Sequence, residues 1–133
     1  MTTPLSMHSL FGNLPIELTE ERIEALLETP GFRLERILSR GQVTPEGEWY
    51  DQEQDEWVAL LQGGARLVIE GHAEEIGMRP GDCVLLPAHC RHRVAWTDPD
   101  SVTVWLALHY PTRTLESSGT TRTSLPSRGG VAE

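Results

Sequence analysis

The feature that most constrains the fold is the pattern of short β-favouring runs and turn residues in residues 32–110. Short runs of residues that favour β-structure alternate there with glycine, proline and aspartate turns. We expect eight strands: 32–39, 48–53, 56–62, 65–70, 73–78, 83–87, 91–96 and 101–110. Gly71-His72 suits a two-residue hairpin loop. Many short strands at a spacing of roughly 8–12 residues predict an all-β antiparallel sandwich or barrel.

The flanking segments differ from this middle part. Residues 14–31 predict one short helix, with Thr19 as N-cap, Glu20 and Glu21 in its first turn, and Thr29-Pro30-Gly31 ending it. Thirteen of the 22 residues in 112–133 are Ser, Thr, Gly or Pro, which predicts a disordered tail. The expected organisation is an N-terminal extension with a short helix over 1–31, a β-barrel domain over 32–111, and the tail.

Composition excludes several classes of protein. Twenty acidic residues and eleven arginines, with no lysine, give a formal net charge of −9. Nucleic-acid binders and proteins of anionic membranes need a basic face, so neither partner is expected. No apolar run approaches the ~20 residues of a membrane span. The two cysteines, Cys83 and Cys90, are too few for a disulfide framework and predict reduced thiols in a cytoplasmic protein.

Two segments carry the chemistry. In the second, Gly81 is followed by five residues and Pro87, and His92 lies five residues further on. In the first, Glu56 is followed by six residues and Gly63. These spacings resemble the two signature motifs of the cupin superfamily, over Glu35 to Tyr110.

The match departs from the family in both motifs. His89 replaces the inner glycine of the second motif, and Trp96 stands at its asparagine. The first motif lacks its two histidines, whose places fall on Tyr50 and Gln52. The pattern is similar to small single-domain bacterial cupins of uncharacterised function.

The resemblance implies one cupin jelly-roll barrel in which the matched positions face inward. Glu56 and His92 would then converge with Gln52 on a divalent metal such as Mn, Fe, Ni or Zn, and Glu56 or Tyr50 would handle protons. The expected function is binding of a small polar metabolite, with metal-dependent catalysis left open. The resemblance also implies a homodimer.

Other readings remain open from the sequence. Without the two histidines, Glu56 can hydrogen-bond Tyr50 or His92 in a metal-free sensory or carbohydrate-binding module. A structural dimerisation unit would instead need an apolar barrel interior, which the polar residues at inward positions oppose.

Several residues have ambiguous roles. His89 is either a further ligand or a turn histidine, Cys90 either a soft ligand or a small buried thiol, and His109 either lines the barrel or is a satisfied core histidine. Asp51 and Asp55 are expected to be surface or loop acids.

The negative charge is local. Residues 46–56 contain six acids and no arginine, which gives −6. Residues 17–28 contain five acids and one arginine, which gives −4 and is expected to be a solvated helix face. The first block lies on the degenerate first motif and favours a cation at the mouth of the barrel.

Overall fold

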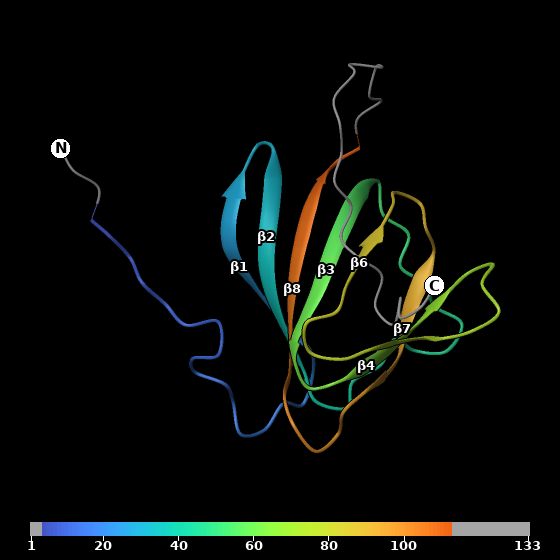
Figure 1. The fold of residues 1–133 in the computed structure, drawn as a ribbon, viewed down its shortest axis with the longest axis horizontal. Helices are drawn as coiled ribbons and strands as arrows, with labels where there is room; N and C mark the ends of the chain where they lie inside the picture. Colours follow the sequence, from blue (N-terminus) through green and yellow to red (C-terminus); the bar gives the residue numbers. More distant parts are fainter. Residues whose placement is uncertain (1–3, 113–133) are drawn as a thin grey trace, which may run out of the picture.

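The computed structural model describes residues 4–112, which form eight strands in two antiparallel sheets (Figure 1). The strands are β1 (Arg22–Thr29), β2 (Phe32–Ser39), β3 (Gln54–Gln62), β4 (Ala65–Ile69), β5 (Ile76–Met78), β6 (Cys83–Leu86), β7 (His92–Thr97) and β8 (Thr103–Pro111). This part of the chain contains no helix, and so none that could cross a membrane. The all-β prediction is confirmed.

The two sheets form the walls of a jelly roll. The larger has the strand order β1-β2-β8-β3-β6 and the smaller the order β5-β4-β7. Figure 1 shows the β1–β2 hairpin at the outer edge of the larger sheet, on the side away from β4 and β7. Because side chains alternate across each strand, one face of each sheet points into the space between them.

The core fills one part of this space. Its largest cluster consists of buried apolar residues from both sheets: Val58, Leu60, Ala65, Leu67, Ile69, Met78, Leu86, Trp105 and Ala107. In the rest of the space between the sheets, the inward positions of the same strands carry polar side chains. The barrel is therefore packed in one part and lined with hydrogen-bonding groups in the other.

The helix predicted over residues 14–31 is absent, and Arg22–Thr29 form β1 instead. This segment pairs antiparallel with β2 from Arg22↔Leu38 to Thr29↔Phe32, with a bulge between Ala25 and Leu27. The predicted helix stop is the turn of the hairpin, where the Thr29 hydroxyl accepts the amide of Gly31 at 3.1 Å. Pairing along β2 outweighs a helical spacing of apolar residues that has no partner surface of its own.

A buried arginine attaches the N-terminal segment to the larger sheet. Arg36, on β2, is 6% exposed and forms an ion pair with Glu24 of β1 at 2.6 Å. Its guanidinium also donates to the carbonyls of Leu10 at 3.1 Å and Gly12 at 2.7 Å. These charge-assisted bonds hold residues 10–12 against the hairpin.

Most of the other strand predictions are confirmed, with one failure. Seven of the eight predicted strands overlap observed ones, but 48–53 forms only an isolated bridge, from Tyr50 to His92. Gly71 is not in a two-residue hairpin. The His72 amide donates to the Ile69 carbonyl at 3.0 Å and Gly71 has φ 90°, which fits the third position of a type II turn. The predicted tail lies outside the described residues after Thr112.

Candidate functional site

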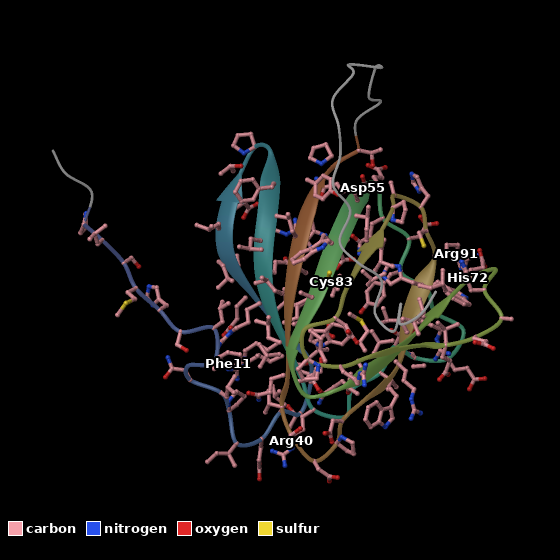
Figure 2. The ribbon with its side chains drawn as sticks, in the orientation of Figure 1. Phe11, Arg40, Asp55, His72, Cys83 and Arg91 are labelled. Carbon is pink, nitrogen blue, oxygen red and sulfur yellow. The ribbon has the colours of Figure 1, made fainter. Side chains whose placement is uncertain are left out.

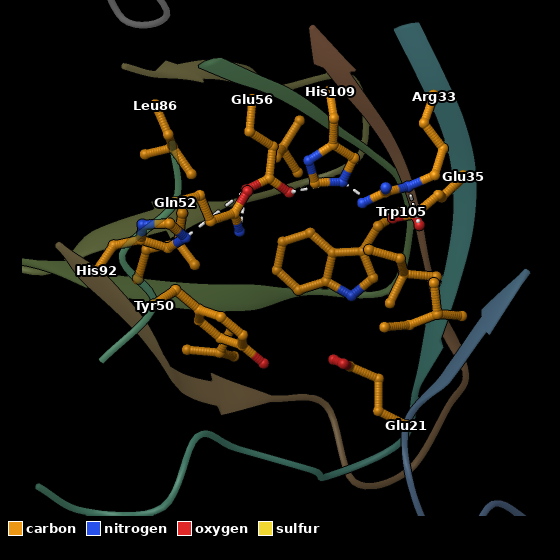
Figure 3. A pocket seen from close by; sticks show the side chains of 15 residues that line it. Glu21, Arg33, Glu35, Tyr50, Gln52, Glu56, Leu86, His92, Trp105 and His109 are labelled. Atoms are coloured by element: carbon orange, nitrogen blue, oxygen red, sulfur yellow. Dashed lines mark hydrogen bonds and ion pairs between the residues drawn. The ribbon is translucent and has the colours of Figure 1, made fainter. Parts of the chain in front are cut away.

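A cavity of about 210 Å³ lies between the sheets where the inward positions become polar (Figure 3). It is lined by Glu21, Ile23, Arg33, Glu35, Ile37, Tyr50, Gln52, Glu56, Val58, Leu67, Leu86, His92, Val94, Trp105 and His109. An engineered apolar cavity of about 150 Å³ binds one benzene molecule, so this space can hold a small ring-sized ligand. The four site residues predicted from the sequence, Tyr50, Gln52, Glu56 and His92, all line this cavity.

Strand register brings three charged or polar groups into one row across the larger sheet. Glu56 of β3 pairs with His109 of β8, and His109 pairs with Arg33 of β2. Directly paired residues have Cβ atoms about 5 Å apart, so these side chains are neighbours. Glu35 lies two positions from Arg33 on the same face of β2.

His109 lies between two carboxylates. Its Nε2 is 3.0 Å from Glu35 Oε1 and 3.8 Å from Glu56 Oε2 (Figure 3). His109 is 5% exposed and its Nδ1 has no hydrogen-bond partner. Because a carboxylate oxygen only accepts, Nε2 of His109 donates to Glu35, and the buried Nδ1 is left without a partner. Arg33 completes the array through a 2.8 Å ion pair with Glu35.

His92 approaches Glu56 from the smaller sheet. Its Nδ1 donates to the Cys90 carbonyl at 2.8 Å, because a carbonyl oxygen only accepts, and its Nε2 faces Glu56. Nε2 is 3.8 Å from Glu56 Oε1. The ring stacks on Tyr50, with centroids 5.4 Å apart, and the Tyr50 amide donates to the His92 carbonyl at 2.7 Å.

Glu56 is a buried acid in the centre of this group of side chains. It is 7% exposed and accepts a hydrogen bond from the Gln52 amide at 3.3 Å. Burial raises the pKa of Glu56, while the neighbouring His109 and His92 oppose that rise. A carboxyl whose pKa is raised can carry a proton nearer to neutral pH than an ordinary glutamate.

The opposite side of the cavity holds Glu21 and Tyr50. Burial raises the pKa of Glu21, which a hydrogen bond with Ser39 partly offsets. Burial, and next the charge of Glu21, raise the pKa of Tyr50. The phenol therefore stays protonated at neutral pH and can donate a hydrogen bond to a ligand.

The residues with ambiguous roles lie mainly outside the cavity. His89 is exposed, has φ 62° and pairs with Asp51 at 2.9 Å, so it is a turn histidine. Asp55 accepts hydrogen bonds from the Ala88 amide at 2.8 Å and the Thr112 hydroxyl at 2.7 Å, which ties the two motif segments together. Figure 2 shows Asp55 near the start of β3.

The remaining ambiguous residues divide between the core and the cavity wall. Cys90 packs against the core as a small thiol and His109 lines the cavity. Trp96 lies outside the cavity, under the Arg66 guanidinium at 5.1 Å. Trp105 is the tryptophan that lines the cavity.

The donor atoms near Glu56 can be compared with what a divalent metal requires. Glu56, Gln52 and Nε2 of His92 are the three candidate ligands, with the Gln52 amide nitrogen facing Glu56 at 3.3 Å. A ligating histidine commonly donates its other N–H to a carbonyl, as His92 does. His109 is engaged by Glu35. Within residues 4–112 no group of three His, Cys, Asp or Glu side chains is placed to hold an ion. A divalent metal here would have only Gln52, Glu56 and His92 as protein ligands.

Sequence reasoning misses three charged residues of the site. The sequence pattern places Glu21 on a solvated helix face, but Glu21 lines the cavity because its segment runs into β1. Arg33 and Glu35 alternate with Ile37 on one face of β2, a strand whose predicted bounds are correct. That alternation is the available signal, but only the pairing of β2 with β8 shows that this face meets His109.

Comparison with known proteins agrees with this architecture. The family model described as Cupin domain matches residues 37–109. A solved structure from Ralstonia eutropha JMP134, provisionally named a mannose-6-phosphate isomerase, is 47% identical. The match covers 81% of this chain and all of that one, with a TM-score of 0.79. No match to a curated protein is found.

More distant structures share the fold. A cupin superfamily protein from Desulfitobacterium hafniense DCB-2 is 15% identical over 82% of this chain and 94% of its own, with a TM-score of 0.65. An RmlC-like cupin protein from Desulfovibrio desulfuricans is 18% identical over 82% of this chain and all of its own, with a TM-score of 0.63. With the two-sheet barrel, the inward Glu56 and His92, and a family match over more than half its length, this chain belongs to the cupins.

Proposed function

We propose that this cupin binds a small polar metabolite inside its barrel and transfers protons to or from it through Glu56. The observation that carries the proposal is the placement of a buried, pKa-raised carboxyl in a cavity beside two imidazoles. Buried ionisable groups are costly, and such groups gather where ligands are bound or transformed.

The roles of the neighbouring side chains follow from their hydrogen bonds. Glu56 takes up or gives a proton, and Nε2 of His92 lies beside it on the same side of the cavity. Tyr50, held by its stacking on His92, donates a hydrogen bond from its neutral phenol to a polar group of the ligand. His109 and Glu35 orient Glu56 from behind.

A divalent metal belongs to the same proposal. When bound, it would be held by Gln52, Glu56 and His92 and would act as a Lewis acid on an oxygen of the ligand. The hard, oxygen-rich donor set favours Mn or Fe over Cu, with Ni and Zn as further candidates.

Metal content tests this part of the proposal directly. Protein purified without an affinity tag and then incubated with Mn, Fe, Ni or Zn should retain close to one equivalent of one of these metals, measured by elemental analysis. The Glu56→Ala/His92→Ala double variant should retain almost none, because it loses two of three ligands. Wild-type protein with less than about a tenth of an equivalent under every condition would refute the metal site.

A metal-free binding module without turnover is the second candidate. Its specific support is that His109, the nearest additional imidazole, donates to Glu35 instead of facing an ion. This candidate keeps the same ligand site, and it predicts that ligand affinity is unchanged by a strong chelator. The two candidates therefore differ in one binding measurement with and without the chelator.

The relative from Ralstonia eutropha supports a carbohydrate-like ligand for this chain. The cavity wall agrees with such a ligand, since Trp105 offers an apolar surface beside several hydrogen-bonding side chains. We also propose a cytoplasmic location, with which the two free cysteines are compatible.

We further propose that the chain forms a homodimer through β1. This edge strand exposes Leu26 and Leu27, which are 38% and 57% exposed. An edge strand with unpaired backbone groups and apolar side chains favours pairing with another chain.

A charged substitution on β1 tests the dimer. Wild-type protein should elute as a dimer in size-exclusion chromatography with light scattering, and Leu27→Arg should shift it to monomer because the charge would be buried at the interface. Leu85→Arg is the matched control, since Leu85 is 50% exposed on β6 at the opposite edge of the same sheet. A monomeric wild type, or a dimer that survives Leu27→Arg, would contradict this interface.

A further inference from the structure

The cavity has a second acidic end that the proposed chemistry at Glu56 does not use. Glu21 lies just before β1, and Figure 3 shows its carboxylate directed toward the space beside the Tyr50 hydroxyl and the Trp105 indole. Glu56 points toward the same space from the other side of Trp105 (Figure 3). The ligand is therefore expected to meet a carboxylate at each end.

The charges around the cavity do not cancel. Its lining contains three glutamates and one arginine, and the chain has no lysine. Arg33 is engaged by Glu35 at 2.8 Å. Among residues 4–112, no arginine forms an ion pair with Glu21 or Glu56. Among these residues Glu21 is thus left without a cationic partner, and Glu56 has only the imidazoles of His92 and His109 beside it, each at 3.8 Å.

We propose that Glu21 recognises an ammonium group, so that the ligand is a small amine and not a phosphate ester. This inference rests on the proposed function, in which the cavity binds a metabolite, and it names the class of that metabolite. A cationic group beside Glu21 supplies the charge that the protein itself lacks there, whereas a phosphate dianion would meet two carboxylates and an arginine that is already paired.

The aromatic lining favours the same class. Trp105 and Tyr50 both line the cavity, and the face of an aromatic ring attracts a cation through its quadrupole. The Trp105 Nε1–H donates to the Ser39 hydroxyl at 3.2 Å, which fixes the orientation of the indole. A fixed indole and a carboxylate together select an organic cation over a neutral group of similar size.

The assignment of Glu21 is separate from the metal question. The candidate metal ligands are Gln52, Glu56 and His92, and Glu21 is not among them. A divalent ion at Glu56 would leave Glu21 uncompensated. An amine at Glu21 can therefore bind with or without a metal.

A charge series on one sugar scaffold tests the proposal. Binding of mannosamine, mannose and mannose 6-phosphate is measured by calorimetry, and the site is located by NMR shifts of the Trp105 indole. Mannosamine should bind about tenfold more tightly than mannose, because one charge-assisted contact is gained, and mannose 6-phosphate should bind most weakly. Glu21→Gln should abolish the preference for the amine. Glu20→Gln, the same change on the exposed neighbouring residue, should retain it.

Each other outcome overturns the assignment. If mannose binds at Trp105 as tightly as mannosamine, the ligand class is wrong while the metabolite pocket stands. Equal or tighter binding of the phosphate ester also overturns it, as does an amine preference that survives Glu21→Gln. If Mn²⁺ alone changes the NMR signal of the Trp105 indole and mannosamine does not, the cation of this cavity is a metal. If no sugar of the series binds, the amine assignment fails, and a broader ligand screen then decides on the pocket.

Discussion

Gly63→Ala should lower the free energy of unfolding by about 3 kcal/mol, which corresponds to a fall of about 10 °C in Tm. Gly63 has φ +87°, a conformation that side chains rarely adopt. A Cβ at this position would also lie 2.7 Å from the backbone Cα of Thr103 and closer still to its hydroxyl oxygen. Thr103 is fully buried on β8 and cannot move aside.

A second glycine separates the cost of the positive φ from the cost of the contact with Thr103. Gly71 has φ +90°, but a methyl group added there would meet nothing within 4 Å, so Gly71→Ala should cost only the backbone strain, about 1 kcal/mol. Thermal unfolding of both variants measures the difference. Equal losses would show that the close approach to Thr103 is not what this motif glycine provides. The glycine that completes the first motif is therefore expected to serve the fold and not the chemistry.

Glu56→Gln should stabilise the protein at neutral pH. Burial raises the pKa of Glu56 in the folded state, so ionising this carboxyl costs more there than in the unfolded chain. The contribution of Glu56 to the free energy of unfolding is therefore fully present below the pKa of the carboxyl in the unfolded chain, near 4.5. It is lost as the pH rises through the raised pKa of the folded state. Glutamine keeps the shape of the side chain but never ionises.

The variant should therefore unfold at a higher temperature than wild type above the raised pKa of Glu56, and the two should converge in acid. Unfolding measured across this pH range tests the sign, with Glu53→Gln, an exposed acid of the same segment, as control. A Glu56→Gln variant that is less stable at neutral pH would show that the carboxylate is compensated in the fold. The same substitution removes the group that transfers the proton, so it should abolish any turnover.

Much of the barrel can be predicted from the sequence because its strands are bounded by strong turn residues. The predicted bounds of β2 are correct, and the spacing from Gly81 through Pro87 to His92 indicates the family. β1 cannot be predicted in this way, because its apolar residues fit a helical spacing and only pairing with β2 favours a strand. A local pattern does not contain the partner that decides between them.

The site also contains residues that local sequence motifs predict and residues that only strand pairing brings together. Motif spacing identifies Tyr50, Gln52, Glu56 and His92, and all four line one cavity. Glu35 and Glu21 come from segments that the motifs do not include, and their approach depends on the order of strands in the larger sheet. Residues 48–53, predicted as a strand, form only the bridge between Tyr50 and His92, and the Gln52 carbonyl accepts the amide of His89 beyond it.

We propose above all that the cavity around Glu56 binds a small polar metabolite. The most direct test is a thermal-shift screen of neutral and cationic polar metabolites against wild type, Glu56→Gln and Glu53→Gln. We predict compounds that raise the Tm of wild type and of Glu53→Gln, with the shift lost in Glu56→Gln. Compounds that stabilise all three proteins equally, or a screen without any stabilising compound, would contradict the claim.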